Sequence, residues 1–319
     1  MDPEEGWIRL AFFAAMAMMF IVALATADPF GKSAVVFAAA YFGVRVTHAV
    51  VFFAVARDDA TFRRAVGTLL PGFVLSPALL LAASVFEGPT RGLLWVLAFA
   101  VDFAGPFLGG ARGWRLNPSH FAERHGLIVI IALGETIVSV GAGATAVGVP
   151  FRLGVVGVLV VLITAMFWWL YFDIVAIAAE RKLHELSGQA RNALARDSYS
   201  YLHLLLVAGV VLVALGCKKT AADPTKTLTT IPAVALAVGA GLYLVTLSAL
   251  RRRNYGTFNA ARLIAAPFVA VMSWLAARNV SGTAGLGALF FISAALVAYE
   301  SLRNADARHA IRHQDSVPG

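Results

Sequence analysis

Apolar stretches of about 20 residues recur along the whole chain, separated by short polar connections. A helix needs a stretch of that length to cross the hydrocarbon core of a bilayer. The pattern therefore predicts an all-α, polytopic helical membrane protein with about ten transmembrane helices in one bundle. The expected spans are residues 7–27, 34–56, 66–86, 93–110, 126–147, 154–179, 199–216, 231–250, 258–277 and 283–302.

These spans form one multi-pass transmembrane domain over residues 1–303, and we expect residues 304–319 to form a polar cytoplasmic tail. The longest connection, residues 180–198, is rich in charged side chains. We interpret it as a solvated loop, with a short amphipathic helix at the membrane surface as the alternative. No internal repeat is visible, so symmetry gives no argument for a transporter built from inverted repeats.

Composition excludes a soluble protein, because 60% of the residues are hydrophobic and only 14% are charged. Soluble proteins of ordinary composition carry about a quarter of charged residues. The net charge of +8 is spread over loops and tails, so it indicates topology rather than nucleic-acid binding. Alternate connections carry more than twice as many Lys and Arg as the others, which places both termini in the cytoplasm. A single cysteine, Cys217, excludes an internal disulfide.

The segment 117–141 is the most informative part of the chain. Asn117 and Pro118 have the residue types of an N-cap and a first helical residue, and His120 and Glu123 then share a helix face. Glu135 follows within the apolar part, eight residues after Leu127, which is roughly 12 Å along a helix. A carboxylate at that depth is costly and is by default a hypothesis of function.

Four other expected spans also carry ionisable residues inside apolar runs, several of them in pairs on one helix face. Arg45 pairs in this way with His48, Trp169 with Asp173 and Tyr199 with His203, while Asp102 stands alone. Most of these groups lie roughly 12–18 Å from one side of the membrane, and His203 lies at about 6 Å. We therefore predict one polar layer, formed by Arg45, His48, Asp102, Glu135, Asp173 and His203.

Charge balance suggests what this polar layer does. With neutral histidines, it holds one guanidinium and three carboxylates, so Arg45 can pair with only one of them. The others should hold a proton, meet a cation or face water, and a proton held there suits proton exchange. The alternative is that the ionisable groups only fix helix packing. The chain has no helical pair of metal ligands, no phosphate loop and no dinucleotide fingerprint, so we predict no metal and no cofactor.

The sequence ERHGLIVIIALGE resembles the motif E-R-x-G-L-x-x-I-x-L-G-E of the low temperature requirement protein A (LtrA) family. Matching positions include Glu123, Arg124 and Glu135, and RVTH, WWLYFD and YSYLH also resemble family segments. The resemblance implies a multi-pass protein of the bacterial inner membrane, linked by name to growth in the cold, with no fixed biochemical activity.

Members of this family usually begin with a span that contains an LFFDLVFV-type motif, which has no counterpart here. We therefore expect a truncated or shortened member, and the resemblance carries over no site that needs the aspartate of that motif. Glu123 and Arg124 join the polar layer as candidate residues for binding substrate or protons.

Three functions fit these observations. The first is a proton-coupled transporter or permease for a small molecule or ion. The second is a membrane-embedded enzyme that acts on a lipid or hydrophobic molecule, with Glu135 or Asp173 and His48 or His203 as general acid and base. The third is a structural or regulatory membrane protein linked to cold growth, in which the polar layer specifies packing. In each case the lipid bilayer is the expected partner, and nucleic acid is not.

Overall fold

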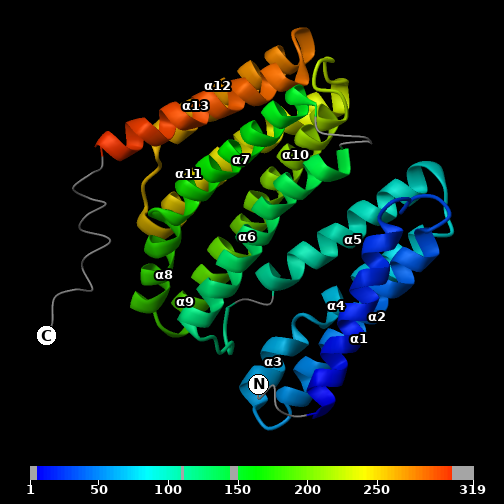
Figure 1. The fold of residues 1–319 in the computed structure, drawn as a ribbon. Helices are drawn as coiled ribbons and strands as arrows, with labels where there is room; N and C mark the ends of the chain where they lie inside the picture. The colour runs from blue at the N-terminus through cyan, green and yellow to red at the C-terminus, as the bar shows by residue number, and fades with distance from the viewer. Residues whose placement is uncertain (1–5, 109–110, 144–149, 304–319) are drawn as a thin grey trace, which may run out of the picture. The chain divides into compact units, whose positions relative to one another are not determined.

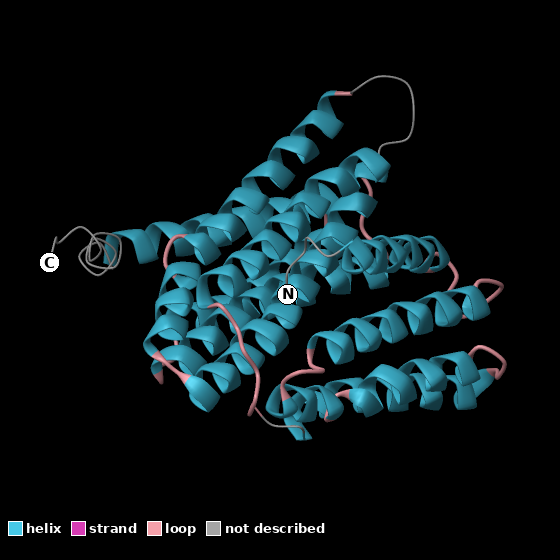
Figure 2. Cartoon of the chain, turned by 90° about the horizontal axis from the view of Figure 1, so that it is seen from below, coloured by secondary structure: helices cyan, strands magenta, loops and turns pink. Residues whose placement is uncertain are grey.

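The computed structural model describes residues 6–108, 111–143 and 150–303, and within these ranges every regular element is a helix (Figure 2). In this part of the chain, 10 helical runs are long and apolar enough to cross a membrane. The prediction of an all-α, polytopic membrane protein is therefore confirmed. The predicted tail at 304–319 lies outside the described residues.

The chain divides into two compact units. Unit 1 comprises Met1–Arg115 and Gly188–Ala193, and unit 2 comprises Leu116–Ser187 and Leu194–Gly319. The expectation of one bundle over residues 1–303 stays a prediction, and each unit is described by itself.

In unit 1, α2 packs against α1 and α4, and α4 packs against α5 (Figure 1). The core centres on the buried residues Ala38, Leu80 and Ala98, against which aromatic side chains such as Trp95 pack. The helices of this unit are α1 (Gly6–Ala25), α2 (Ala34–Val55), α3 (Ala60–Gly67), α4 (Leu70–Ala83) and α5 (Gly88–Leu108).

The span predicted at 66–86 is built differently from the expectation. The helical run begins at Ala60 and is interrupted between α3 and α4. Pro71 lies in the first turn of α4. Because proline has no N–H, it cannot donate to the carbonyl of Gly67 and extend α3. The start of this span was therefore predicted too late, and Pro71 marks the start of α4.

Asp59 caps α3 by accepting hydrogen bonds from the backbone N–H groups of Thr61 (3.0 Å) and Phe62 (3.1 Å). The Phe62 N–H, the Arg115 guanidinium and the Thr61 N–H hold the pKa of the Asp59 carboxyl below its ordinary value of 3.8. The ionised Asp59 cap therefore stabilises α3 above pH 3.8. This stabilisation is lost as the pH falls through the lower pKa that Asp59 has in the folded state.

We expect amide exchange at Thr61 and Phe62, corrected for its intrinsic rate, to accelerate on acidification below pH 3.8, and hydrogen-exchange mass spectrometry can follow it. Asp59→Asn is the matched control, because asparagine caps helices without titrating. Equal acceleration in the variant and the wild-type protein would show that Asp59 is not the cause.

Unit 2 is organised around α11, because 72% of the residues in its apolar 18-residue stretch are buried, the largest such share among the candidate spans. Helix α11 packs between α10 and α12; α10 also contacts α6, and α13 contacts α12 and α7 (Figure 1). The helices of this unit are α6 (Pro118–Gly143), α7 (Phe151–Phe172), α8 (Val175–Glu185), the π-helix η1 (Ala195–Leu202), α10 (His203–Ala222), α11 (Thr230–Tyr255), α12 (Ala260–Asn279) and α13 (Gly282–Arg303).

Two glycines allow α10 and α11 to approach closely. A Cβ atom added at Gly239 would lie 2.6 Å from the Gly209 carbonyl oxygen, and one added at Gly209 would lie 2.9 Å from the Gly239 carbonyl oxygen. Helix backbones in membranes approach this closely only where small residues meet. These two positions therefore fix the central contact of unit 2.

The start of α6 confirms the prediction made from its sequence. The helix begins at Pro118, and the backbone N–H of His120 donates to Oδ1 of Asn117 at 3.3 Å. The expected shared face of His120 and Glu123 is also confirmed, because His120 Nδ1 lies 3.6 Å from Glu123 Oε2.

The interpretation of residues 180–198 as a solvated loop is wrong. The segment is largely helical, with the end of α8, then α9 (Gly188–Leu194) and the start of η1. Leu183 and Leu194 are buried in an apolar cluster that also contains Ala179, Ala195 and Tyr199. The apolar residues among the charges therefore form a packed face, as in the alternative of an amphipathic helix.

Candidate functional site

The predicted site residues are divided between the two units. Arg45, His48 and Asp102 belong to unit 1. The others belong to unit 2, and they are Glu123, Arg124, Glu135, Asp173 and His203. A single polar layer that joins both sets stays a prediction, whereas the arrangement within each unit can be described.

In unit 1, Arg45 of α2 forms an ion pair with Asp102 of α5 through Nη2 and Oδ1. Tyr41 donates a second hydrogen bond to Asp102 Oδ2 at 3.1 Å, and the Arg45 guanidinium lies 4.7 Å from the ring centre of Phe73. The prediction that Arg45 pairs with one of the carboxylates is confirmed. His48 is exposed.

The family-like motif of α6, residues 123–135, has its charged side chains on the exposed side of the helix. Glu123, Arg124 and Glu135 are all exposed, whereas Thr136 and Ser139 lie on the buried face. Glu135 is therefore separate from the buried polar groups of unit 2.

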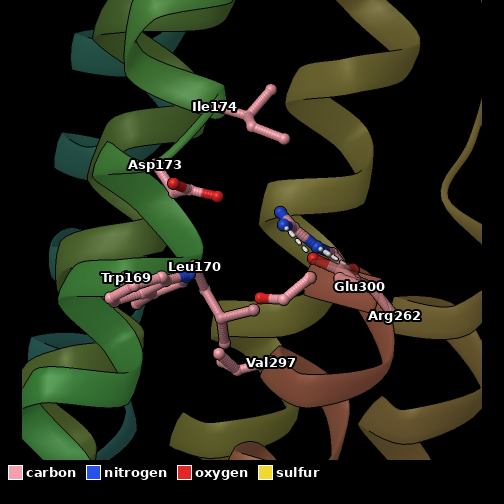
Figure 3. Close-up of a pocket in the computed structure, with 8 residues that line it drawn as sticks. Trp169, Leu170, Asp173, Ile174, Arg262, Val297 and Glu300 are labelled. Carbon is pink, nitrogen blue, oxygen red and sulfur yellow. Dashed lines mark hydrogen bonds and ion pairs between the residues drawn. The ribbon is translucent and has the colours of Figure 1, made fainter. Parts of the chain in front are cut away.

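Asp173 is the buried carboxylate of unit 2, and its residue is only 8% exposed. It lies where α7 ends, and α8 begins after an irregular residue, Ile174 (φ −134°, ψ −43°). Asp173 and Trp169 line the same pocket, which confirms that they share a helix face (Figure 3). A broken helix thus places a carboxylate inside a run of residues long enough to span the membrane.

The other wall of this pocket carries an ion pair whose two residues were not among the predicted site residues (Figure 3). Arg262 of α12 donates through Nε to Glu300 Oε1 at 2.8 Å and through Nη2 to Oε2 at 2.7 Å. The two side chains are 7% and 14% exposed. Asn259, the N-cap of α12, also donates a hydrogen bond to Glu300 Oε1, at 2.8 Å. Arg262 and Glu300, from two helices, therefore lie opposite Asp173 in this pocket.

A sequence signal for this pair exists but is ambiguous. Arg262 lies near the start of the predicted span 258–277, and Glu300 lies near the end of 283–302. Charged side chains at span ends commonly extend to the membrane surface, so nothing local distinguishes a buried pair from two surface charges.

The cavity between these groups is small, at about 10 Å³. A volume of this size holds about one water molecule. In this conformation the pocket can therefore hold a water molecule, but it cannot enclose an organic molecule.

His203 belongs to a second buried cluster in unit 2. Its Nδ1 lies 2.8 Å from the Ser198 carbonyl oxygen, which can only accept, so Nδ1 carries the proton. Nε2 of the neutral ring then accepts from the Tyr171 hydroxyl at 2.7 Å. The rings of Tyr199 and His125 pack against His203 at 5.0 and 5.4 Å between ring centres. Tyr171 and His125 were not singled out from the sequence, although both lie in segments that were.

Within residues 6–108, 111–143 and 150–303, no three His, Cys, Asp or Glu side chains gather into a group that could hold a metal ion.

Comparison with known proteins places this architecture in a family. The family described as bacterial low temperature requirement A protein (LtrA) matches residues 1–299. An uncharacterized protein of Rhizobium meliloti strain 1021, RA0937, is 27% identical over 241 residues, which cover 70% of this chain and 57% of that protein. The chain thus spans a little over half the length of this relative. No solved structure matches.

Proposed function

The chain belongs to the bacterial low temperature requirement A family, and for it we propose proton-coupled transport of a small solute, with Asp173 as the proton-binding group. The observation that carries the proposal is the placement of a buried carboxylate at a helix break, facing the Arg262–Glu300 ion pair, whose side chains are 7% and 14% exposed. Ionisable residues inside membrane helices mark ion and substrate pathways, and interrupted helices commonly hold the coupling ion.

The chemistry of the pocket favours a proton over a metal cation. The Arg262 guanidinium lines the same cavity and repels a metal cation placed at Asp173, most strongly a divalent one. The cavity is also too small for a hydrated metal ion, because it holds about one water molecule. The solute itself then binds elsewhere, or in a more open conformation.

Two carboxylates that face one guanidinium supply a coupling mechanism. With Asp173 protonated, Arg262 stays in its two-point contact with Glu300. With Asp173 ionised, α7 gains an attraction for Arg262 that competes with Glu300 on α13. The proton therefore biases the equilibrium between two arrangements of α7 against the α12–α13 pair, as an ion-coupled transporter requires.

For orientation, we infer that the side richer in Lys and Arg faces the cytoplasm of a bacterial inner membrane, with both termini on that side. The lipid bilayer is the surrounding partner, and a small molecule or an ion is the transported one.

Replacement of Asp173 by asparagine should reduce proton movement by about 100-fold or more, because the amide cannot carry the proton. The purified protein is reconstituted into liposomes that contain a pH-sensitive dye. A pH gradient is imposed, the membrane potential is clamped, and Na⁺, K⁺, ethidium and a mixture of amino acids are added in turn. We expect at least one probe to drive proton movement in the wild-type protein.

The matched control is Asp58→Asn, which removes a carboxylate whose side chain is 87% exposed. It should leave proton movement unchanged. Failure of all four probes to drive proton movement through the wild-type protein would refute the proposal, and so would wild-type rates in the Asp173→Asn variant.

A further inference from the structure

An apolar groove of about 530 Å³ runs between α12 and α13 and opens to the surface. All nine residues that line it are aliphatic or aromatic, and Ile264, Phe268, Phe291 and Tyr299 among them are exposed. Among the described residues, those that line the groove and those that line the Asp173 pocket are two different sets. The groove is therefore a separate feature of this helix pair.

The groove has the length of a hydrocarbon chain from one leaflet of a membrane. Both of its walls are candidate membrane spans. On α13 the lining residues extend from Phe291 to Tyr299, which is about 12 Å along a helix. One leaflet contributes roughly 15 Å of hydrocarbon, half the core of a bilayer. A single acyl chain can therefore lie along most of the groove.

Arg303 stands at the Tyr299 end of the groove. Its Nη1 donates to the Tyr299 hydroxyl, and its guanidinium carbon lies 5.7 Å from the centre of the Tyr299 ring. A guanidinium has five N–H donors, so others remain for a ligand. Glu300 accepts from Arg262 with both oxygens, and within residues 6–108, 111–143 and 150–303 no carboxylate forms an ion pair with Arg303. The mouth of the groove therefore carries a positive charge that the described residues do not neutralise.

Two more exposed arginines lie at the same end of the helices, in the last turns of α11, just before α12 begins. Arg251 donates to the Thr257 hydroxyl at 3.3 Å, and Arg252 donates to the Gly256 carbonyl oxygen. Both acceptors are neutral, so the two positive charges persist. Basic residues gathered at the ends of membrane helices attract anionic lipid head groups.

We propose that this groove binds one anionic phospholipid, with an acyl chain between α12 and α13 and the phosphate at the Arg303 guanidinium. A guanidinium binds a phosphate through two parallel hydrogen bonds, which suits the position of Arg303. A helix from a second copy of the chain fits less well. A helix about 10 Å across and as long as the groove occupies roughly 900 Å³, which is more than the groove holds.

The head-group contact is tested by native mass spectrometry of the detergent-solubilised full chain, with dioleoyl phosphatidylglycerol or dioleoyl phosphatidylcholine added at equal concentration. The two lipids share their acyl chains and differ in net charge, and we expect the wild-type protein to prefer phosphatidylglycerol. Arg303→Gln should lower this preference about fivefold, the factor that one arginine near a membrane surface contributes. Arg152→Gln, which removes an exposed arginine at the start of α7, is the control and should keep the preference.

The groove itself is tested with Ala295→Trp, which places an indole ring where the acyl chain lies. This variant should bind both lipids more weakly than the wild-type protein. Ala298→Trp, at an exposed position of α13 outside the lining set, should bind them as the wild-type protein does. The Tm of each variant shows whether it is folded, and Ala295→Leu replaces Ala295→Trp if the larger side chain prevents folding.

Three results would overturn the lipid site: no preference for phosphatidylglycerol in the wild-type protein, an unchanged preference in Arg303→Gln, or unchanged binding of both lipids in the folded Ala295 variant. A dimer of the full chain that excludes lipid and is lost in the Ala295 variant would also overturn it, because the groove would then belong to a second copy.

Discussion

Replacing Arg262 alone by methionine is expected to destabilise unit 2 by about 3–5 kcal/mol. The change leaves Glu300, whose side chain is only 14% exposed, without the guanidinium that holds both of its oxygens. The remaining Asn259 contact satisfies only one of these oxygens. The effect can be measured as the unfolding free energy in a denaturant titration of the solubilised protein.

The double variant Arg262→Met/Glu300→Leu should recover most of this loss, because well-packed apolar residues often replace a buried ion pair at little cost. Arg252→Met, which removes an exposed arginine of α11, is the control and should change stability little. A double variant as unstable as the single one would show that the pair is not the cause. A stable double variant that no longer moves protons would separate the proposed function from the alternative in which the pair only fixes packing.

A second large effect is expected at the crossing of α10 and α11. Gly239→Ala places a methyl group 2.6 Å from the Gly209 carbonyl oxygen and 2.8 Å from Leu212 Cβ. Neither helix backbone can move aside without disturbing the core around α11, so we expect a loss of about 1–3 kcal/mol, measured in the same titration. Most of this range exceeds the gain of about 1 kcal/mol that alanine gives over glycine in a helix, so we expect the variant to be less stable overall.

Gly287→Ala supplies the control, because a Cβ atom at this position of α13 would meet no other atom within 4 Å. This variant should be neutral or slightly more stable than the wild-type protein. If both glycine variants behaved alike, helix propensity rather than the close approach of α10 and α11 would determine their stability.

The apolar pattern was enough to predict the architecture, because the length of each span follows from bilayer thickness and not from tertiary contacts. Local signals were also reliable where the chemistry is local, as at Asn117 and Pro118. The pattern failed at residues 180–198, where charged residues mask an apolar face that becomes clear only when Leu183 and Leu194 pack together.

The candidate site was predicted less well, because depth along a helix does not determine which way a side chain points. Glu135 and Ser139 lie on the same span, yet Ser139 is buried and Glu135 is exposed. Asp173 was identified correctly as a buried carboxylate. Its neighbours Arg262 and Glu300 come from helices far along the chain, and only the packing of α7 against α13 brings them to one pocket.

The short turn between α12 and α13 has a consequence for how the chain enters the membrane. Only Val280 and Ser281 separate the two helices, so Arg262 at the start of one and Glu300 near the end of the other come to the same end of an antiparallel hairpin. A single helix entering lipid would expose its charge, whereas a hairpin enters with the charge already neutralised. The ion pair therefore leads us to expect that α12 and α13 enter the membrane together as one hairpin.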